Sequence, residues 1–163
     1  LEMLGSHLYI ETNAALSRIG GLNKLETVNG YVNVVNNPVL SNLDGFSSLS
    51  SIKSYLRIGT NEALLDMTGL EALNAVNGFL EIVGNEGLET LSGLGSLTDV
   101  GGHVLIQNND ALLNLEGLSG LLNIGGDCTV IEHAKLCGVD TESFLKTISI
   151  EGSTTVTDNG GCL

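Results

Sequence analysis

The chain has 163 residues, 42% of them hydrophobic, which is enough for one compact domain with a continuous apolar core. Only 6 basic residues stand against 19 acidic ones, a net charge of −13, which excludes the basic footprint that nucleic-acid binding requires. No stretch approaches the roughly 20 apolar residues that span a bilayer, so we expect neither a nucleic-acid partner nor direct membrane insertion.

A unit of 24 residues repeats along the chain. Its most regular position is an asparagine, and His133 stands where the sixth would fall. The asparagines are Asn13, Asn37, Asn61, Asn85 and Asn109. A fixed period of this size indicates a stack of similar coils. Leu1 falls in the middle of a coil, on the column of Leu25, so we expect the chain to be a piece of a larger protein.

Each asparagine follows a short segment in which apolar residues alternate with other residues. The apolar pairs are Leu8 and Ile10, Val32 and Val34, Leu56 and Ile58, Leu80 and Ile82, Val104 and Ile106, and Cys128 and Val130. Alternation with period two predicts one strand with a buried face in every coil. After the asparagine, an apolar residue recurs at every third position, as in Leu88, Leu91 and Leu94. That period fits a chain winding around an apolar axis in short pieces and turns.

Glycines recur at two corners of the coil. One column is Gly21, Gly45, Gly69, Gly93 and Gly117, and the other is Gly30, Gly78, Gly102 and Gly126. Because glycine reaches positive φ without steric cost, both columns predict sharp bends.

Stacking would place equivalent strands about 4.8 Å apart, parallel and in register. The asparagine column would then form a ladder inside a turn. Each side-chain amide would bond backbone groups or the amides above and below it. We therefore interpret the ladder asparagines as structural rather than ligand-binding.

The repeat fails after Leu136, so residues 1–136 are expected to form coils and 137–163 a C-terminal cap. The cap sequence predicts a turn, a short helix that starts near Asp140 or Thr141, and a strand-like segment near 148–156. A solenoid needs such a cap to cover its last apolar layer.

The unit G-x-L-x-I-x-x-N-x-x-L-x-x-L-x-G-L-x-x-L-x-x-I resembles the receptor L domain of insulin and epidermal growth factor receptors, which also occurs in fungal cell-wall proteins. The cap is similar too, with Leu136-Cys137, then Phe144, Ile148 and Cys162. The resemblance covers essentially the whole chain. It implies an all-β fold, a right-handed parallel β-helix of about six coils with a short C-terminal helical cap. The family commonly has Trp at the position of Phe144, and its N-terminal cap is not visible here.

A leucine-rich-repeat horseshoe is the competing fold. In that repeat, leucine usually follows the asparagine by two positions, whereas here it follows by three, as in Asn61 and Leu64. This spacing favours the β-helix.

The resemblance implies a disulfide between Cys137 and Cys162 that ties the cap together. Cys128 occupies a strand column and fits a small buried residue, although pairing with either of the other two cysteines is an alternative. A disulfide indicates an oxidising compartment, so we expect a secreted protein, extracellular or at the cell surface.

Signatures of catalysis are missing from the sequence, which contains no G-x-S-x-G elbow, H-E-x-x-H motif or P-loop. We expect no enzyme and no cofactor, and the cysteines and histidines lack zinc-ligand spacing. Glu62, Glu86 and Asp110 follow the asparagine column and would stack. They predict either a solvated turn or a calcium site shared with carbonyl oxygens.

The outward strand positions carry aromatic and charged residues that are typical of binding hot spots. The residues expected to bind are Tyr9, Tyr31, Tyr55, Arg57, Phe79, Glu81 and His103. The resemblance also implies a ligand on this face. The other interpretation is that aromatic residues suit exposed strands and shield the neighbouring backbone.

These patterns predict an extracellular or cell-surface module for recognition or adhesion that binds a protein or glycan partner. One alternative is a structural repeat of a cell wall, surface layer or filament that stacks on neighbouring domains or copies of itself. Another is a leucine-rich-repeat interaction domain.

Overall fold

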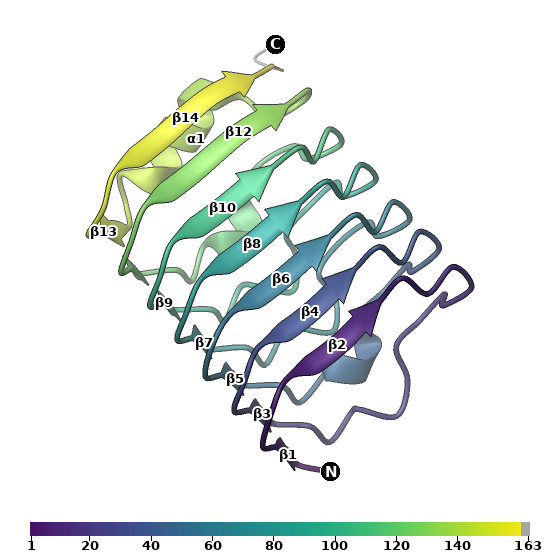
Figure 1. Ribbon diagram of the computed structural model, residues 1–163. Coiled ribbons are helices and arrows are strands. Elements are labelled where there is room, and N and C mark those ends of the chain that lie inside the picture. The colour runs from purple at the N-terminus through teal and green to yellow at the C-terminus, as the bar shows by residue number, and fades with distance from the viewer. Residues whose placement is uncertain (161–163) are drawn as a thin grey trace.

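The computed structural model describes residues 1–160 and is a β-solenoid of about seven turns with two parallel sheets (Figure 1). Every coil gives one short strand to a small sheet and one longer strand to a large sheet. The small sheet consists of β1 (Met3–Leu4), β3 (Thr27–Val28), β5 (Ser51–Ile52), β7 (Ala75–Val76), β9 (Asp99–Val100), β11 (Asn123–Ile124) and β13 (Ser149–Ile150). The large sheet consists of β2 (Leu8–Glu11), β4 (Val32–Val35), β6 (Leu56–Gly59), β8 (Leu80–Val83), β10 (Val104–Gln107), β12 (Cys128–His133) and β14 (Thr154–Asn159). The predicted parallel β-helix is confirmed.

The period-two pattern sets which side of each large-sheet strand is buried. In β8, Leu80 and Ile82 are completely buried, whereas Glu81 and Val83 face outward and are partly exposed. Leu80 pairs in parallel with Leu56 of the preceding strand, so equivalent side chains lie directly above one another. The repeat in the sequence thereby becomes a set of files along the solenoid axis.

The third side of the coil consists of tight turns. The backbone N–H of Leu64 donates to the carbonyl of Asn61 at 3.1 Å, that of Leu70 to Met67 at 3.1 Å, and that of Leu73 to Leu70 at 3.0 Å. Each turn advances three residues, which explains the apolar period of three. Two of these segments are 3-10 helices, η1 (Asp44–Phe46) and η2 (Glu116–Leu118).

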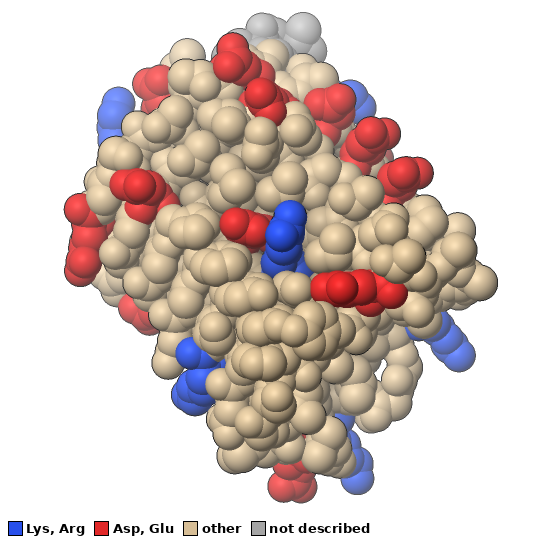
Figure 2. Space-filling model, viewed as in Figure 1, with Lys and Arg blue, Asp and Glu red and all other residues tan. Residues whose placement is uncertain are grey.

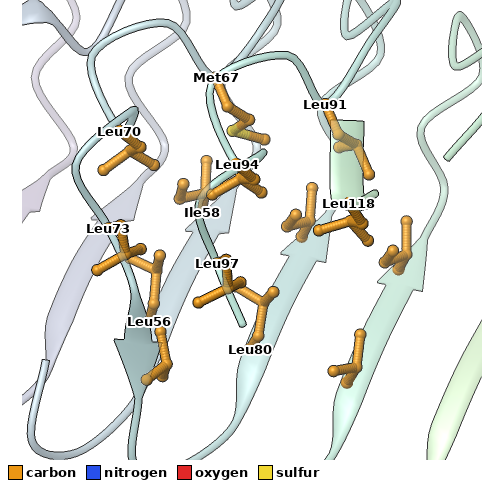
Figure 3. Packing of buried hydrophobic residues seen from close by; sticks show 14 of the residues in the cluster. Leu56, Ile58, Met67, Leu70, Leu73, Leu80, Leu91, Leu94, Leu97 and Leu118 are labelled. Atoms are coloured by element: carbon orange, nitrogen blue, oxygen red, sulfur yellow. The ribbon is translucent and has the colours of Figure 1, made fainter. Parts of the chain in front are cut away.

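The core lies between the turns and the inner face of the large sheet (Figure 3). Leu70, Leu94 and Leu118 follow one another in a file opposite the strand residues Ile58 and Leu80. None of these side chains is more than 1% exposed. Because each buried leucine contributes about 1.5–3 kcal/mol, the apolar files are the main stabilising feature of the fold.

Glycine plays two different roles at the corners. The bends expected in the first column are confirmed at Gly21, Gly69 and Gly93, where φ is 81°, 109° and 110°. The bends expected in the second column are also present, at Gly30, Gly78, Gly102 and Gly126, but none of these glycines has positive φ. There, a Cβ on Gly78 would lie 2.9 Å from the backbone carbonyl of Ser54 in the preceding coil, so close approach between coils explains the glycine.

The predicted count of six coils is one too low, because β13 and β14 continue both sheets. Cys128 pairs with Thr154, 26 positions later, whereas Val104 pairs with Cys128, 24 positions later. The helix α1 (Gly138–Leu145) lies within this last coil and accounts for its different length.

The start of α1 also differs from the expectation, since the helix begins at Gly138 and not near Asp140. Its N-cap residue is Cys137, whose side chain makes no capping bond. Instead, the hydroxyl of Thr141 donates to the carbonyl of Cys137 at 2.9 Å. Within residues 1–160, no helix has the length and apolar character needed to cross a membrane.

Candidate functional site

The asparagine column forms the expected ladder. The side-chain oxygen of Asn61 accepts hydrogen bonds from the backbone N–H and the side-chain amide of Asn37, at 3.1 and 3.2 Å. The amide of Asn61 donates to the carbonyl of Val34 at 2.9 Å and to the oxygen of Asn85 at 3.3 Å. Asn61 is fully buried, so these bonds satisfy polar groups that water does not reach.

The ladder extends past its last asparagine in the repeat. His133 fills the sixth position and is 1% exposed. Asn159 pairs with His133 at the seventh position and donates to the carbonyl of Val130 at 2.9 Å, but its buried side-chain oxygen has no hydrogen-bond partner among the described residues. The sequence interpretation missed Asn159 because it lies 26 residues after His133. The signal that would have identified it is the spacing, since Asn159 follows Thr154 by five positions, as Asn85 follows Leu80.

The residue before each ladder position has a left-handed backbone, a second feature that the sequence interpretation missed. The φ values lie between 53° and 69° at Thr12, Asn36, Thr60, Gly84, Asn108, Glu132 and Asp158. This conformation turns the chain out of the large sheet in every coil. The sequence does carry a signal for this conformation. The column contains asparagines, a glycine and an aspartate, and these residue types tolerate positive φ.

Five aromatic rings stack in one continuous row along the start of the large-sheet strands. They belong to His7, Tyr31, Tyr55, Phe79 and His103. Successive ring centroids lie 3.9, 4.3, 4.2 and 4.8 Å apart, and successive ring planes differ by 19°, 7°, 8° and 12°. Adjacent rings therefore cover each other's faces and leave mainly their edges to solvent. Desolvation, together with the neighbouring Tyr31, raises the pKa of Tyr55 above its ordinary value.

Tyr9 differs from the stacked rings. Its plane is nearly perpendicular to that of Tyr31, at 87°, with the centroids 5.2 Å apart. The residue is 54% exposed. Tyr9 thus remains accessible beside the stack.

Glu81 joins the aromatic row to the middle of the sheet. Its carboxylate lies 3.4 Å from the Nε of Arg57 and 3.4 Å from the Nε2 of His103. The side chains of Arg57 and Glu81 are 49% and 18% exposed. An ion pair at the surface contributes little to stability, so this pair mainly matters for the charge it balances on the sheet. All seven predicted binding residues therefore lie on one face, which we call the strand face.

The charges of the strand face lie mostly on its first and last strands, and the two in its middle pair with each other. Among the outward or exposed positions of its strands, the charged residues are Glu11, Arg57, Glu81, Glu132 and Asp158, of which only Arg57 and Glu81 lie on the middle strands β4 to β10. Partly exposed aliphatic side chains lie between them, including Val83 and Leu105. In Figure 2, most charged side chains lie toward the outline of this view, and few lie over the middle of the large sheet.

The calcium interpretation is not supported. Within the part of the chain that the structure describes, no three carboxylate, histidine or cysteine side chains gather as a possible metal site. Asp110 instead accepts a hydrogen bond from the backbone N–H of Ala134 at 3.3 Å. Glu62 and Glu86 are exposed, as expected for a solvated turn.

Cys128 is a free, buried cysteine, which confirms the expectation of a small buried residue and excludes the alternative that it pairs with another cysteine. Burial raises the pKa of its thiol to about 11, which keeps it protonated and unreactive. Cys162 lies outside the described residues. The disulfide between Cys137 and Cys162 therefore stays a prediction.

The chain matches no family model, no curated protein and no solved structure. The resemblance to the receptor L domain thus stays a prediction that depends on the repeat motif and the cap residues.

Proposed function

We propose that this chain is a recognition module, extracellular or at the cell surface, that binds a protein partner through its strand face. The observation that carries the proposal is the middle of the strand face, strands β4 to β10, where the charged outward residues are the paired Arg57 and Glu81, on a chain of net charge −13. Depletion of charge together with exposed aromatic side chains and an arginine is typical of the core of a protein interface.

The aromatic row favours a protein partner over a glycan. A sugar ring packs on the open face of an aromatic ring, and the stacked rings from Tyr31 to Phe79 cover one another's faces. Tyr9, with 54% exposure, and Arg57, with a half-exposed side chain, are the best placed to contact a partner. They project from strands β2 and β6 in the same outward column.

The test compares a strand-face variant with a variant of matched chemistry elsewhere. Tyr9→Ser with Arg57→Ser removes an aromatic and a cation from the strand face. Leu122→Ser with Lys53→Ser removes a similarly exposed apolar residue and a cation from other sides. Proteins from an extracellular extract that bind the natural chain and the control, but not the strand-face variant, are the expected result.

Equal binding of both variants would contradict the proposal. A glycan array probed with the natural chain separates the two partner classes. Specific glycan binding lost in the strand-face variant would replace the protein partner by a glycan.

A structural repeat module is the second candidate, favoured by the first coil. Leu8 and Ile10 are only partly buried, whereas their counterparts Val32 and Val34 are fully buried. Stacking on another coil would cover them. Sedimentation of the natural chain at rising concentration checks whether it self-associates. Met3 is exposed on β1, the first strand of the small sheet, so Met3→Glu should abolish any such self-association.

A further inference from the structure

His133 copies the hydrogen bonds of a ladder asparagine with an imidazole. Its Nδ1 accepts the backbone N–H of Asn109 at 3.1 Å, so the ring proton resides on Nε2. Nε2 donates to the carbonyl of Ile106 at 3.1 Å. Asn109 makes the equivalent side-chain bond to the carbonyl of Ile82 at 2.9 Å. The neutral Nε2–H tautomer is therefore the form that fits the ladder.

Protonation removes the acceptor that this position needs. An imidazolium has two donors and no acceptor, so the buried N–H of Asn109 would face another N–H. The new proton can reach only the carbonyl of Asn109, 3.2 Å from Nδ1. The other residues that make ladder bonds are asparagines, which do not titrate.

A carboxylate stands in each of the three coils that meet at this position, and burial opposes the positive charge that the two nearest ones favour. Asp110 lies in the turn of the preceding coil, Glu132 is beside His133 on β12, and Asp158 precedes Asn159, the partner of His133, on β14. Desolvation is the largest effect and lowers the pKa of His133 below its ordinary value. The hydrogen bonds to the carbonyls of Asn109 and Ile106 and the charges of Asp110 and Glu132 favour the cation but do not offset it.

The location of His133 makes this effect local. It joins the coil of β10 to the last two coils, which comprise β12, α1 and β14. The side chains of β14 are mostly exposed, so this end buries less apolar surface than the middle. Contacts in a solenoid run only between neighbouring coils, so a weakened ladder position can release one end. We propose that His133 makes residues 128–160 an acid-sensitive end of the solenoid, which opens on acidification while the earlier coils stay folded.

Hydrogen exchange of the full chain at pH 7.5 and pH 5, corrected for intrinsic rates, tests the proposal. Because the folded form prefers neutral His133, the stabilisation is complete above about pH 6.5, the ordinary pKa, and is lost as the pH falls toward the lowered one. Protection of residues 128–160 should fall relative to 32–107, by up to about tenfold per pH unit in that window. An unchanged ratio overturns the proposal.

Two variants provide the controls. His133→Asn retains ladder bonding without a titrating group. This variant should abolish the selective loss of hydrogen-exchange protection in residues 128–160 at pH 5. His103→Asn removes a partly exposed histidine and should preserve the selective loss of protection. Selective loss that persists in His133→Asn overturns the proposal. An NMR titration of the natural chain gives an independent readout, since an imidazole that titrates at or above its ordinary pKa also overturns it.

Discussion

Thr60 has a backbone conformation that β-branched residues rarely adopt, with φ at 53°. Asparagine occupies the equivalent position in other coils and tolerates positive φ better. We expect Thr60→Asn to raise the free energy of unfolding by about 1 kcal/mol. Urea unfolding measures the change, with Thr68→Asn, an exposed threonine outside this column, as the control. No gain over the control would contradict this explanation.

The asparagine ladder predicts a loss of stability that is larger than this gain. Asn61→Ala removes the acceptor of two Asn37 donors and the donor to Val34. Leaving these buried groups unpaired should cost about 1–3 kcal/mol. Asn77→Ala, at an exposed asparagine, is the matched control and should change stability little. Thermal or urea unfolding of both variants distinguishes a ladder role from a general loss of an amide.

At the scale of elements, the aromatic row joins five neighbouring coils. Tyr55→Ala interrupts the row and removes two ring pairs. Their loss should lower the free energy of unfolding by about 1–3 kcal/mol, in addition to the loss from buried apolar area. Tyr55→Phe keeps both pairs and should be close to neutral. Equal stability of the alanine and phenylalanine variants, measured by urea unfolding, would show that stacking contributes nothing.

The cap gives a chemical prediction about its cysteines. If Cys137 pairs with Cys162, an alkylating reagent should label only Cys128 in the denatured, unreduced chain. After reduction, it should label all 3 cysteines. Mass spectrometry counts the labels. Three labels without reduction would show that the predicted disulfide is not formed. The main chemical argument for an oxidising compartment would then no longer hold.

The elements that a periodic pattern specifies were predictable from the sequence, and the others were not. The strand at Leu80 and the ladder at Asn61 follow from the period-two and 24-residue spacings. The seventh coil was not predicted because α1 changes the spacing from 24 to 26 residues, and a search at fixed period stops there. The left-handed column was missed because it tolerates several residue types, from Thr60 to Gly84.

The candidate site was predictable only in part for a related reason. Alternation correctly placed Tyr31, Tyr55 and Phe79 on one face. It could not show that their rings lie face to face, because that depends on side-chain rotamers and on the coil spacing. The accessible character of Tyr9 also required the structure, since the sequence gives no reason to separate it from the stacked rings.

At the scale of the whole molecule, a complete coil should be removable. Deleting residues 61–84 joins Thr60 to Asn85 and preserves every column, so we expect a folded solenoid. Its melting temperature and urea m-value should be lower because less surface is buried. Deleting 61–72 removes half a coil, shifts all the columns and should prevent folding. Circular dichroism that gives the same unfolded spectrum for both deletions would contradict the modular organisation.

The stacking of the large sheet gives the molecule a length that changes only in fixed steps. Seven strands, spaced about 4.8 Å apart, extend about 29 Å along the axis. Duplication of one repeat would lengthen that span by a single strand width and leave the distances among existing side chains unchanged. A partner that contacts two separated points would therefore require a fixed whole number of repeats, because the number of coils sets the distance between the two contacts.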